Sequence, residues 1–415
     1  MPCFTRIETQ EEFERYLHGL LGPIKRKNGW QLAEASGQKG PDKTQRLLRK
    51  AQVYQEGIFE VYWRMAKENF ASKEGVMIID DTGFPKSGKF SVGVKHQYCP
   101  TLGKKSVCQI GVFLAYSSPL GRVFLDRRLY LPKEWASDKE RREKAGVPEE
   151  VEFATKPELA LDLLFEQMAS DFPFRWVCAD STYGDSPTFW RGLLACEQEF
   201  VLGYTSTMPV WHYAPTLQKM KAFEVIAQMP KKKWRRLRVK EGSKGFIEYD
   251  WTRKLVYLND GGKKGKRVWL MARRSLSQKK EVKYFICNAA HNVSLLELAR
   301  VAASRWAIEV CFEEAKDNVG LDEYEVRKWI GWHRHTLFSM MAHLFLALLK
   351  KRSEDKKDEE LAQLSVPEVR RLLEIALPLP EKTPEYKWFW SLWRRRHNRK
   401  ALLSHYRIRG HLLVV

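Results

Sequence analysis

The chain has 415 residues, more than one hydrophobic core usually serves, so we expect two or three domains. Hydrophobic residues make up 44% of it, with 21 Phe, 15 Tyr and 15 Trp, a composition that excludes an intrinsically disordered protein. The formal net charge of +21 favours a polyanionic partner, because each phosphate that a protein neutralises releases condensed counterions.

The excess positive charge is concentrated in two stretches. Residues 219–274 hold 18 basic and 5 acidic side chains, and residues 381–415 hold 9 and 2. A field concentrated in this way is typical of a surface that binds nucleic acid. A basic surface without a partner is the simpler alternative.

Cysteine usage and hydropathy indicate a cytoplasmic protein. None of the 7 cysteines has the C-x2-C spacing of a zinc site, and several lie in apolar runs, as buried reduced thiols do. The first residues contain no apolar signal core. The longest apolar run, 336–349, is shorter than the roughly 20 residues that span a bilayer. We therefore expect no membrane partner.

Residues 1–70 are expected to form a helical DNA-binding domain. Thr9 and Glu12 have the spacing of a capping box in front of an apolar helix. Apolar residues then recur at helical spacing from Leu47 to Ala66, among scattered Lys and Arg. A solvated helical bundle is the alternative, since no recognition helix is evident.

Residues 71–204 carry the pattern of an α/β core with a mixed sheet. The apolar run 76–79 predicts a strand that ends in Asp80-Asp81, and 107–116 and 122–131 predict two further strands. A helix over about 157–170 follows, then a strand over 175–179 that ends in Asp180. Strands that alternate with helices in this way are typical of α/β folds.

The second half of the chain is divided in three. Residues 205–280 are rich in lysine and in short strand-like pieces, and predict an inserted, basic, β-rich domain. The core resumes over 281–350 with a strand at 284–287 and a long helix, capped by Ser294, that runs to about Lys316. Residues 351–415 are expected to form a basic helical C-terminal region, in which Ser365 and Glu368 cap a helix.

Two carboxylates stand at strand ends, where ligand and metal sites collect in open α/β sheets. Asp81 follows the first core strand and Asp180 follows the later one. Carboxylate oxygens are hard ligands that suit Mg²⁺ or Mn²⁺ better than zinc. Taken singly, each aspartate is more often the cap of a loop.

A third acid lies on the long helix of the second half. Arg305, Glu309 and Lys316 fall on one helical face, because four and seven residues turn the helix by about 400° and 700°. Taken alone, this stripe is an ordinary ion pair between residues four apart on a solvated face.

Together these acids resemble the DDE transposases of bacterial insertion sequences, in the group four superfamily. The YREK signature there is Tyr, two residues, Arg, three residues, Glu, six residues, Lys. Arg305, Glu309 and Lys316 match its last three positions, whereas Ala302 stands at the Tyr position. The first acid of the family precedes a Thr, which selects Asp81 over Asp80.

The resemblance extends over most of the chain and is strongest to the insertion-sequence group numbered seven hundred and one. It is carried by Asp81-Thr82-Gly83-Phe84-Pro85-Lys86-Ser87-Gly88, Gln109-Ile110-Gly111-Val112-Phe113 and Ala179-Asp180-Ser181-Thr182-Tyr183-Gly184. The resemblance implies a ribonuclease-H-like catalytic core. It also implies an enzyme that cleaves DNA at the ends of an insertion sequence and joins them to target DNA.

The resemblance also implies roles for individual residues. Asp81 would bridge two Mg²⁺ ions, for which Mn²⁺ substitutes, and Asp180 and Glu309 would each complete one ion's shell. Arg305 and Lys316 would contact phosphates beside the scissile bond. A tryptophan of the inserted domain would stack on a flipped base, with Trp234, Trp251 and Trp269 as candidates, although each also suits a core.

The partners implied are the terminal inverted repeats and target DNA, bound by a homodimer in a synaptic complex associated with the bacterial nucleoid. Further DNA contacts are expected from Lys231, Lys232, Lys233, Arg235, Arg236, Arg394, Arg395 and Arg396. Two other functions stay open: a metal-dependent nuclease without strand transfer, and a DNA-binding protein that no longer catalyses.

Other motifs are weaker. Gly83-x4-Gly88-Lys89 lacks the Ser or Thr of a phosphate-binding P-loop, because Phe90 stands there. His333, His335 and His343 lie among apolar residues and are expected to be packed or surface side chains.

Overall fold

A computed structural model of the chain describes residues 3–213, 216–242, 245–276, 281–354 and 363–409. They fall into two compact units. The helical unit comprises Met1–Glu60 with Glu314–Val415, and the sheet unit comprises Val61–Glu313. Two helices, α4 (Gln55–Phe70) and α12 (Trp306–Val319), run from one unit into the other.

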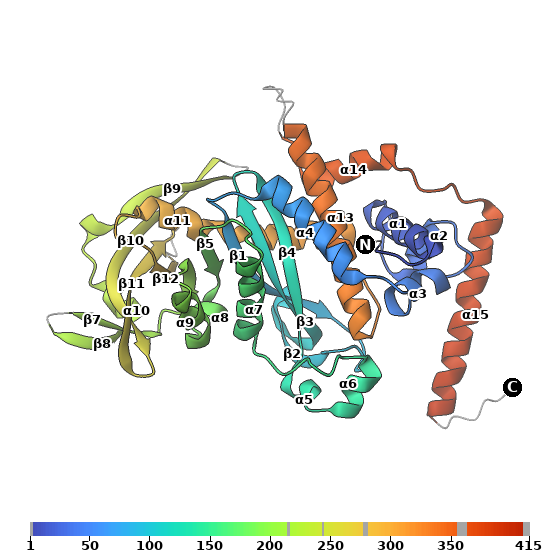
Figure 1. Ribbon diagram of the computed structural model, residues 1–415, viewed down its shortest axis with the longest axis horizontal. Helices are drawn as coiled ribbons and strands as arrows, with labels where there is room; N and C mark the ends of the chain where they lie inside the picture. The colour runs from blue at the N-terminus through green and yellow to red at the C-terminus, as the bar shows by residue number, and fades with distance from the viewer. Residues whose placement is uncertain (1–2, 214–215, 243–244, 277–280, 355–362, 410–415) are drawn as a thin grey trace. The chain divides into compact units, whose positions relative to one another are not determined.

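The sheet unit is built on one sheet of 12 strands (Figure 1). The strands are β1 (Val76–Pro85), β2 (Lys95–Cys99), β3 (Lys104–Ser118), β4 (Gly121–Tyr130), β5 (Trp176–Ala179), β6 (Glu199–Tyr204), β7 (Pro209–Tyr213), β8 (Leu217–Lys221), β9 (Arg235–Gly242), β10 (Gly245–Asp260), β11 (Lys263–Arg274) and β12 (Val282–Asn288). Their order is β2-β3-β1-β5-β6-β12-β11-β10-β7-β8, with β4 on β3 and β9 on β10.

The centre of this sheet is the mixed core that the sequence predicts. Strands β1, β3 and β4 pair antiparallel, whereas β5 and β6 run parallel to β1. The order β4-β3-β1-β5-β6 is the ribonuclease-H-like arrangement, and it confirms the predicted fold class. The first four residues of β1 and all of β5 are apolar and buried, as is typical of strands covered on both faces.

The sheet unit also contains helices from different parts of the chain, some of which pack on the sheet. The set is α5 (Lys133–Ala136), α6 (Lys139–Ala145), α7 (Lys156–Ala169), α8 (Ser181–Gly184), α9 (Pro187–Ala195), α10 (Ala222–Ala227) and α11 (Leu295–Ser304). Helix α7 packs on β3 and β4, and α11 packs on β1, β5 and β6. Figure 1 shows α7 and α9 in front of the sheet and α11 behind it.

The strand-rich segment 205–280 continues the core sheet. Strand β12 pairs with β6 on one side and with β11 on the other, so β11, β10, β7 and β8 extend the same hydrogen-bonded surface. The sequence predicts an insertion rich in strands here. The strands are present, and their backbone pairing joins this segment to the core sheet.

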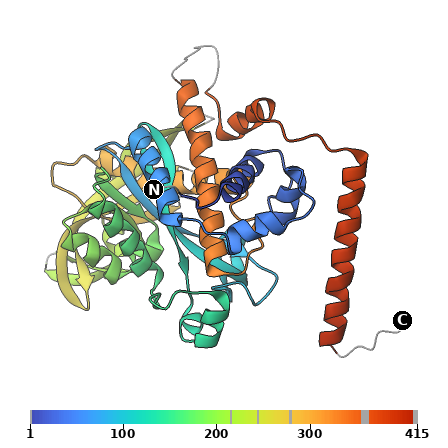
Figure 2. The same ribbon diagram turned by 45° about the vertical axis from the view of Figure 1, so that its right-hand side comes forward.

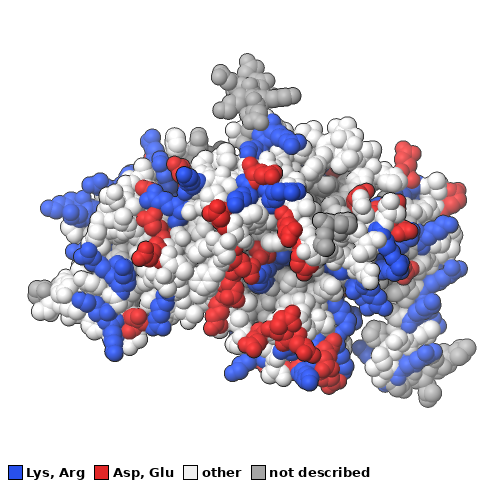
Figure 3. Space-filling view, in the orientation of Figure 1, with Lys and Arg blue, Asp and Glu red and all other residues white. Residues whose placement is uncertain are grey.

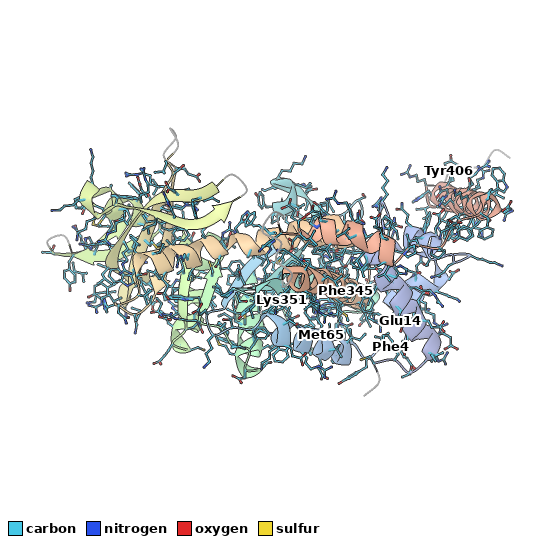
Figure 4. All side chains as sticks on the ribbon, turned by 90° about the horizontal axis from the view of Figure 1, so that it is seen from above. Phe4, Glu14, Met65, Phe345, Lys351 and Tyr406 are labelled. Atoms are coloured by element: carbon cyan, nitrogen blue, oxygen red, sulfur yellow. The ribbon has the colours of Figure 1, made fainter. Side chains whose placement is uncertain are left out.

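The helical unit contains α1 (Ile7–Leu21), α2 (Gly29–Ala35), α3 (Asp42–Arg49), α13 (Trp329–Glu354), α14 (Val366–Ala376) and α15 (Pro384–Ile408). Helix α13 contacts α1, α3 and α14 (Figure 2). The ring of Phe4 packs on Phe13 at 5.0 Å between centroids, beside the helix that carries Glu14 (Figure 4). The predicted capping box of Ser365 and Glu368 is present at α14.

The capping box predicted at Thr9 and Glu12 is wrong. Helix α1 begins at Ile7 after Arg6, which makes no side-chain cap. Glu12 is buried on the inner face of α1, where it accepts hydrogen bonds from Thr44 Oγ1 at 2.7 Å and Gln38 Nε2 at 2.9 Å. A tertiary contact therefore uses the carboxylate that the motif assigns to the backbone.

The histidines of α13 are packed, as predicted. Nδ1 of His335 lies 2.7 Å from the Tyr16 hydroxyl, and Nε2 of His343 lies 3.0 Å from Glu314 Oε2. Both imidazoles are buried. In the described part of the chain, no helix combines the length and apolar character that crossing a membrane requires.

Candidate active site

The aspartates of the predicted site gather where β1 and β5 separate. The two strands pair in parallel from Val76 with Trp176 to Ile79 with Ala179. Strand β5 then ends and is followed by Asp180, whereas β1 continues to Pro85. The interpretation that the first strand ends in Asp80-Asp81 is therefore wrong, because β3 keeps pairing with β1 beyond this point.

Asp180 is the N-cap of α8. Its Oδ1 accepts a hydrogen bond from the Thr182 backbone N–H at 2.9 Å, and its Oδ2 accepts one from the Thr182 hydroxyl, Oγ1, at 3.1 Å. Two glycines let α8 lie directly on β6: a Cβ on Gly203 would come within 2.8 Å of Ser181 N, and one on Gly184 within 1.8 Å of the Gly203 carbonyl. The close packing fixes the position of Asp180 beside β1.

Asp81 forms an ion pair with Lys156. Lys156 Nζ lies 2.7 Å from Asp81 Oδ2, and the Asp81 side chain is only 7% exposed. Lys156 is the first residue of α7, immediately after the N-cap Thr155. The ammonium group at the N-terminus of α7 thus contacts the first carboxylate of the predicted triad.

Asp80 is contacted by a different cation. Its Oδ1 accepts from the Asp81 backbone N–H at 2.8 Å, and its Oδ2 lies 3.3 Å from Arg305 Nη1. Arg305 also pairs with Glu309, one helical turn further on. Arg305 therefore joins Asp80 and Glu309, and through them it ties α12 to β1 of the sheet unit.

The single long helix predicted from Ser294 to Lys316 is interrupted at Arg305. The Ser294 side chain caps α11, as predicted, by accepting from Glu297 N. Arg305 then separates α11 from α12, where Ile308 N bonds to the Arg305 carbonyl at 3.3 Å, a tighter turn than the α-helical one. The contact between Arg305 and Glu309 survives the break, and Lys316 lies further along α12.

Burial raises the pKa values of Asp80 and Asp180, and the neighbouring negative charges add to the rise. Burial raises the pKa of Asp80 to about 7, the charge of Asp180 adds to the rise, and Arg305 opposes it. Burial also raises the pKa of Asp180, with the charge of Asp81 as the next cause. Ionised carboxylates crowded in this way are stabilised by an added cation.

The predicted metal ligands do not share one coordination point. Among the residues that the structure describes, no three Asp, Glu, His or Cys side chains gather closely enough to hold a metal ion. Asp81, Asp180 and Glu309 instead engage Lys156, Thr182 and Arg305, respectively. Their hard oxygens and excess negative charge still suit a divalent cation, which would have to compete with these contacts.

Besides Arg305 and Lys316, the predicted DNA-binding residues lie in two segments, one in each unit; Figure 3 shows Lys and Arg side chains interspersed with Asp and Glu over the visible face. In the sheet unit, the side chains of a short 3-10 turn, Lys231–Lys233, and of Arg235 and Arg236 at the start of β9 are exposed. In the helical unit, Arg395 and Arg396 of α15 are exposed, whereas Arg394 pairs with Glu34 at 2.6 Å. Helix α15 continues past Tyr406 (Figure 4).

The three candidate tryptophans differ in accessibility. Trp251 is 0% exposed and stacks on Phe285, so it presents no face to a base in this structure. Trp269 and Trp234 are half-buried and each lies under a guanidinium: Arg253 over Trp269 at 4.1 Å and Arg274 over Trp234 at 4.3 Å.

Two residues of the site, Asp80 and Lys156, are not among the site residues predicted from the sequence. Asp80 is set aside there in favour of Asp81, yet it is the aspartate that Arg305 contacts. Lys156 carries one sequence signal: a lysine at the first position of a helix opposes the helix dipole, which favours an acid there. That mismatch indicates a partner outside the helix.

The chain is similar in sequence to known DNA-processing proteins. A family model described as DDE superfamily endonuclease matches residues 1–245, which include Asp80, Asp81, Lys156 and Asp180. A probable transposase for insertion sequence element IS701 from Microchaete diplosiphon is 23% identical over 349 residues, 81% of this chain and 83% of that protein.

Two solved structures are more distant. The piggyBac transposase synaptic complex with hairpin DNA has a TM-score of 0.48 at 12% identity, covering 92% of this chain and 76% of that chain. The NurA nuclease from Sulfolobus solfataricus has a TM-score of 0.29 at 9% identity, covering 74% of this chain and 94% of that chain.

Proposed function

The chain belongs to the DDE superfamily endonuclease family, and from this premise we propose that it is a DNA transposase. It cleaves at the ends of an insertion sequence and joins them to target DNA by a cut-and-paste route. The parallel register of β1 and β5, which brings Asp80 and Asp81 beside Asp180 where β5 ends, carries this proposal. The similarity to a probable insertion-sequence transposase supports it.

Asp81, Asp180 and Glu309 are the residues that we expect to hold divalent metal. A pair of Mg²⁺ ions, or Mn²⁺ in their place, would activate a water or 3′-hydroxyl and stabilise the leaving oxygen. Arg305 positions Glu309, since it holds that carboxylate and Asp80 together. The guanidinium of Arg305 would also suit a phosphate beside the scissile bond.

DNA is the partner that the charge distribution favours. The exposed cations of Lys231–Lys233 and β9, and those of α15, would contact phosphates of the terminal inverted repeats and of target DNA. Lys316 would act as a further point charge. A homodimer in a synaptic complex would bring two ends together, in the cytoplasm at the bacterial nucleoid.

The proposal is tested by incubating purified protein with labelled element ends, target DNA and Mg²⁺. A transposase yields joined products, and Asp81→Asn, Asp180→Asn and Glu309→Gln each lower their yield by at least about 100-fold. Glu150→Gln, which changes an exposed acid of the sheet unit, is the matched control and keeps full activity.

Each alternative function has its own outcome in this assay. Cleaved ends without joined products identify a metal-dependent nuclease. Absence of both products, with DNA binding retained and biological activity unaltered by Asp81→Asn, identifies a DNA-binding protein that does not catalyse. Closed ends on a denaturing gel would establish a hairpin step, and their absence during active excision would exclude it.

A further inference from the structure

Lys156 is a cation bound directly to the first carboxylate of the site. Its Nζ lies 2.7 Å from Asp81 Oδ2, and the two residues come from segments 75 residues apart. The Lys156 side chain is 26% exposed, and that of Asp81 is more deeply buried. A contact of this length, largely shielded from water, is a charge-assisted hydrogen bond.

The position of Lys156 in its helix does not explain its presence. The first turn of a helix carries a partial positive charge, which disfavours a lysine. The acid of the same turn, Glu158, serves the capping box: its Oε2 accepts from Thr155 N and Thr155 Oγ1, both at 2.7 Å. The favourable partner of Lys156 is Asp81, across the site.

An ammonium on Asp81 opposes a metal ion on the same carboxylate. Two cations that bind one carboxylate oxygen lie within a few ångströms of each other, where their repulsion is strong in a partly buried site. Without metal, the ammonium of Lys156 is the cation that contacts Asp81, whose charge also acts on Asp180. With metal, it must give up Oδ2, and the flexible lysine stem permits this movement.

We propose that Lys156 is a positioning residue that occupies Asp81 in the metal-free protein, competes with metal for it, and moves to a DNA phosphate when metal binds. This inference rests on the proposed function, because it takes Asp81 to be a metal ligand. The affinity for metal is then lower than the acids alone would give. The Lys156 ammonium also lies close to where the scissile phosphate would bind.

The competition is measured by calorimetric titration of Mn²⁺ into the full-length protein without DNA. We expect Lys156→Met, which removes the ammonium and keeps the stem, to lower the Kd for Mn²⁺ by about 3- to 10-fold. Lys156→Arg keeps the charge and stays within about twofold of wild type. The matched control is Lys95→Met, since Lys95 pairs with Glu134 at 2.5 Å elsewhere in the sheet unit, and it leaves the Kd unchanged.

Cleavage at saturating Mn²⁺ tests the second half of the inference. Lys156→Met then cleaves at least about 10-fold more slowly than wild type, despite its tighter metal binding, and Lys156→Arg recovers most of the rate. Thermal unfolding of each variant checks that it folds, and Lys156→Gln replaces Lys156→Met if the latter does not.

The outcomes separate this inference from the proposed function. An unchanged or higher Kd for Mn²⁺ in a folded neutral variant overturns the competition, and an unchanged cleavage rate overturns the movement to phosphate. If wild-type protein binds no Mn²⁺, or Asp81→Asn binds it as tightly as wild type, the proposed metal site itself is wrong.

Discussion

The substitution Asp80→Asn should stabilise the protein and impair its activity at the same time. The pKa of Asp80 is raised from its ordinary value of 3.8 to about 7, first by burial and then by the charge of Asp180. Each pH unit corresponds to about 1.4 kcal/mol, so ionising this 18% exposed side chain costs the folded state at most about 4 kcal/mol. An asparagine removes that cost and still accepts from the Asp81 backbone N–H.

The sign of the effect follows from proton binding. Between pH 3.8 and 7 the folded state holds more protons at Asp80 than the unfolded state does. Stability from this group therefore falls as pH rises through that window, and the whole cost is present above pH 7. We expect Asp80→Asn to gain about 1 to 3 kcal/mol at pH 8, because Arg305 loses an ion pair, and to gain nothing at pH 4.

Urea denaturation in EDTA at pH 4, 6 and 8 measures this difference, with Glu150→Gln as the control for an exposed acid. DNA cleavage is assayed in parallel and should fall by about 10-fold or more, since Arg305 loses one of the two carboxylates that orient it. A variant whose stability relative to wild type is independent of pH, or falls toward pH 8, would refute the reasoning.

Three further expectations concern other parts of the molecule. Lys27 is 4% exposed, and burial lowers its pKa to about 8, so the free energy of unfolding of the wild-type protein should rise between pH 8 and 10.5. In urea denaturation, Lys27→Met should remove that rise and increase the free energy of unfolding by about 1 to 3 kcal/mol at pH 7. Arg305→Lys cannot hold Asp80 and Glu309 together, so cleavage should fall about 10- to 100-fold, with less than about 1 kcal/mol change in unfolding free energy. Trp251→Ala should lower the free energy of unfolding by about 3 to 5 kcal/mol, and Trp269→Ala should lower it by less. If Trp269 stacks on a base, Trp269→Ala should also weaken the binding of element-end DNA in a gel-shift assay.

The sequence predicts the core strands well because their signal is simple. The first four residues of β1 and all of β5 are apolar, and an aspartate follows each of these runs. The run marks where helices cover both faces and not where hydrogen bonding ends, so β1 continues through Asp80 and Asp81 to Pro85. Pairing with β3 decides that boundary, and β3 lies elsewhere in the sequence.

Two predicted helix boundaries differ from those in the structure, one at Thr9 and one at Arg305. Thr9 and Glu12 satisfy the capping pattern, but Glu12 is taken up by Thr44 and Gln38 of the neighbouring segments. Helical periodicity continues through Arg305, while its guanidinium is held by Asp80 of β1 at the point where α11 gives way to α12. At Glu12 a long-range contact overrides the local preference, whereas at Arg305 the backbone keeps right-handed helical angles and the break is confined to one residue.

The choice between Asp80 and Asp81 illustrates what spacing alone leaves undetermined. The two neighbouring aspartates contact different cations. Arg305 holds Asp80 and Glu309 together, whereas Lys156 makes its one described ion pair with Asp81. A metal ion displaces a single flexible ammonium more readily than a guanidinium that bridges two carboxylates. For this reason we keep Asp81 as the proposed metal ligand and propose that Asp80 orients Arg305.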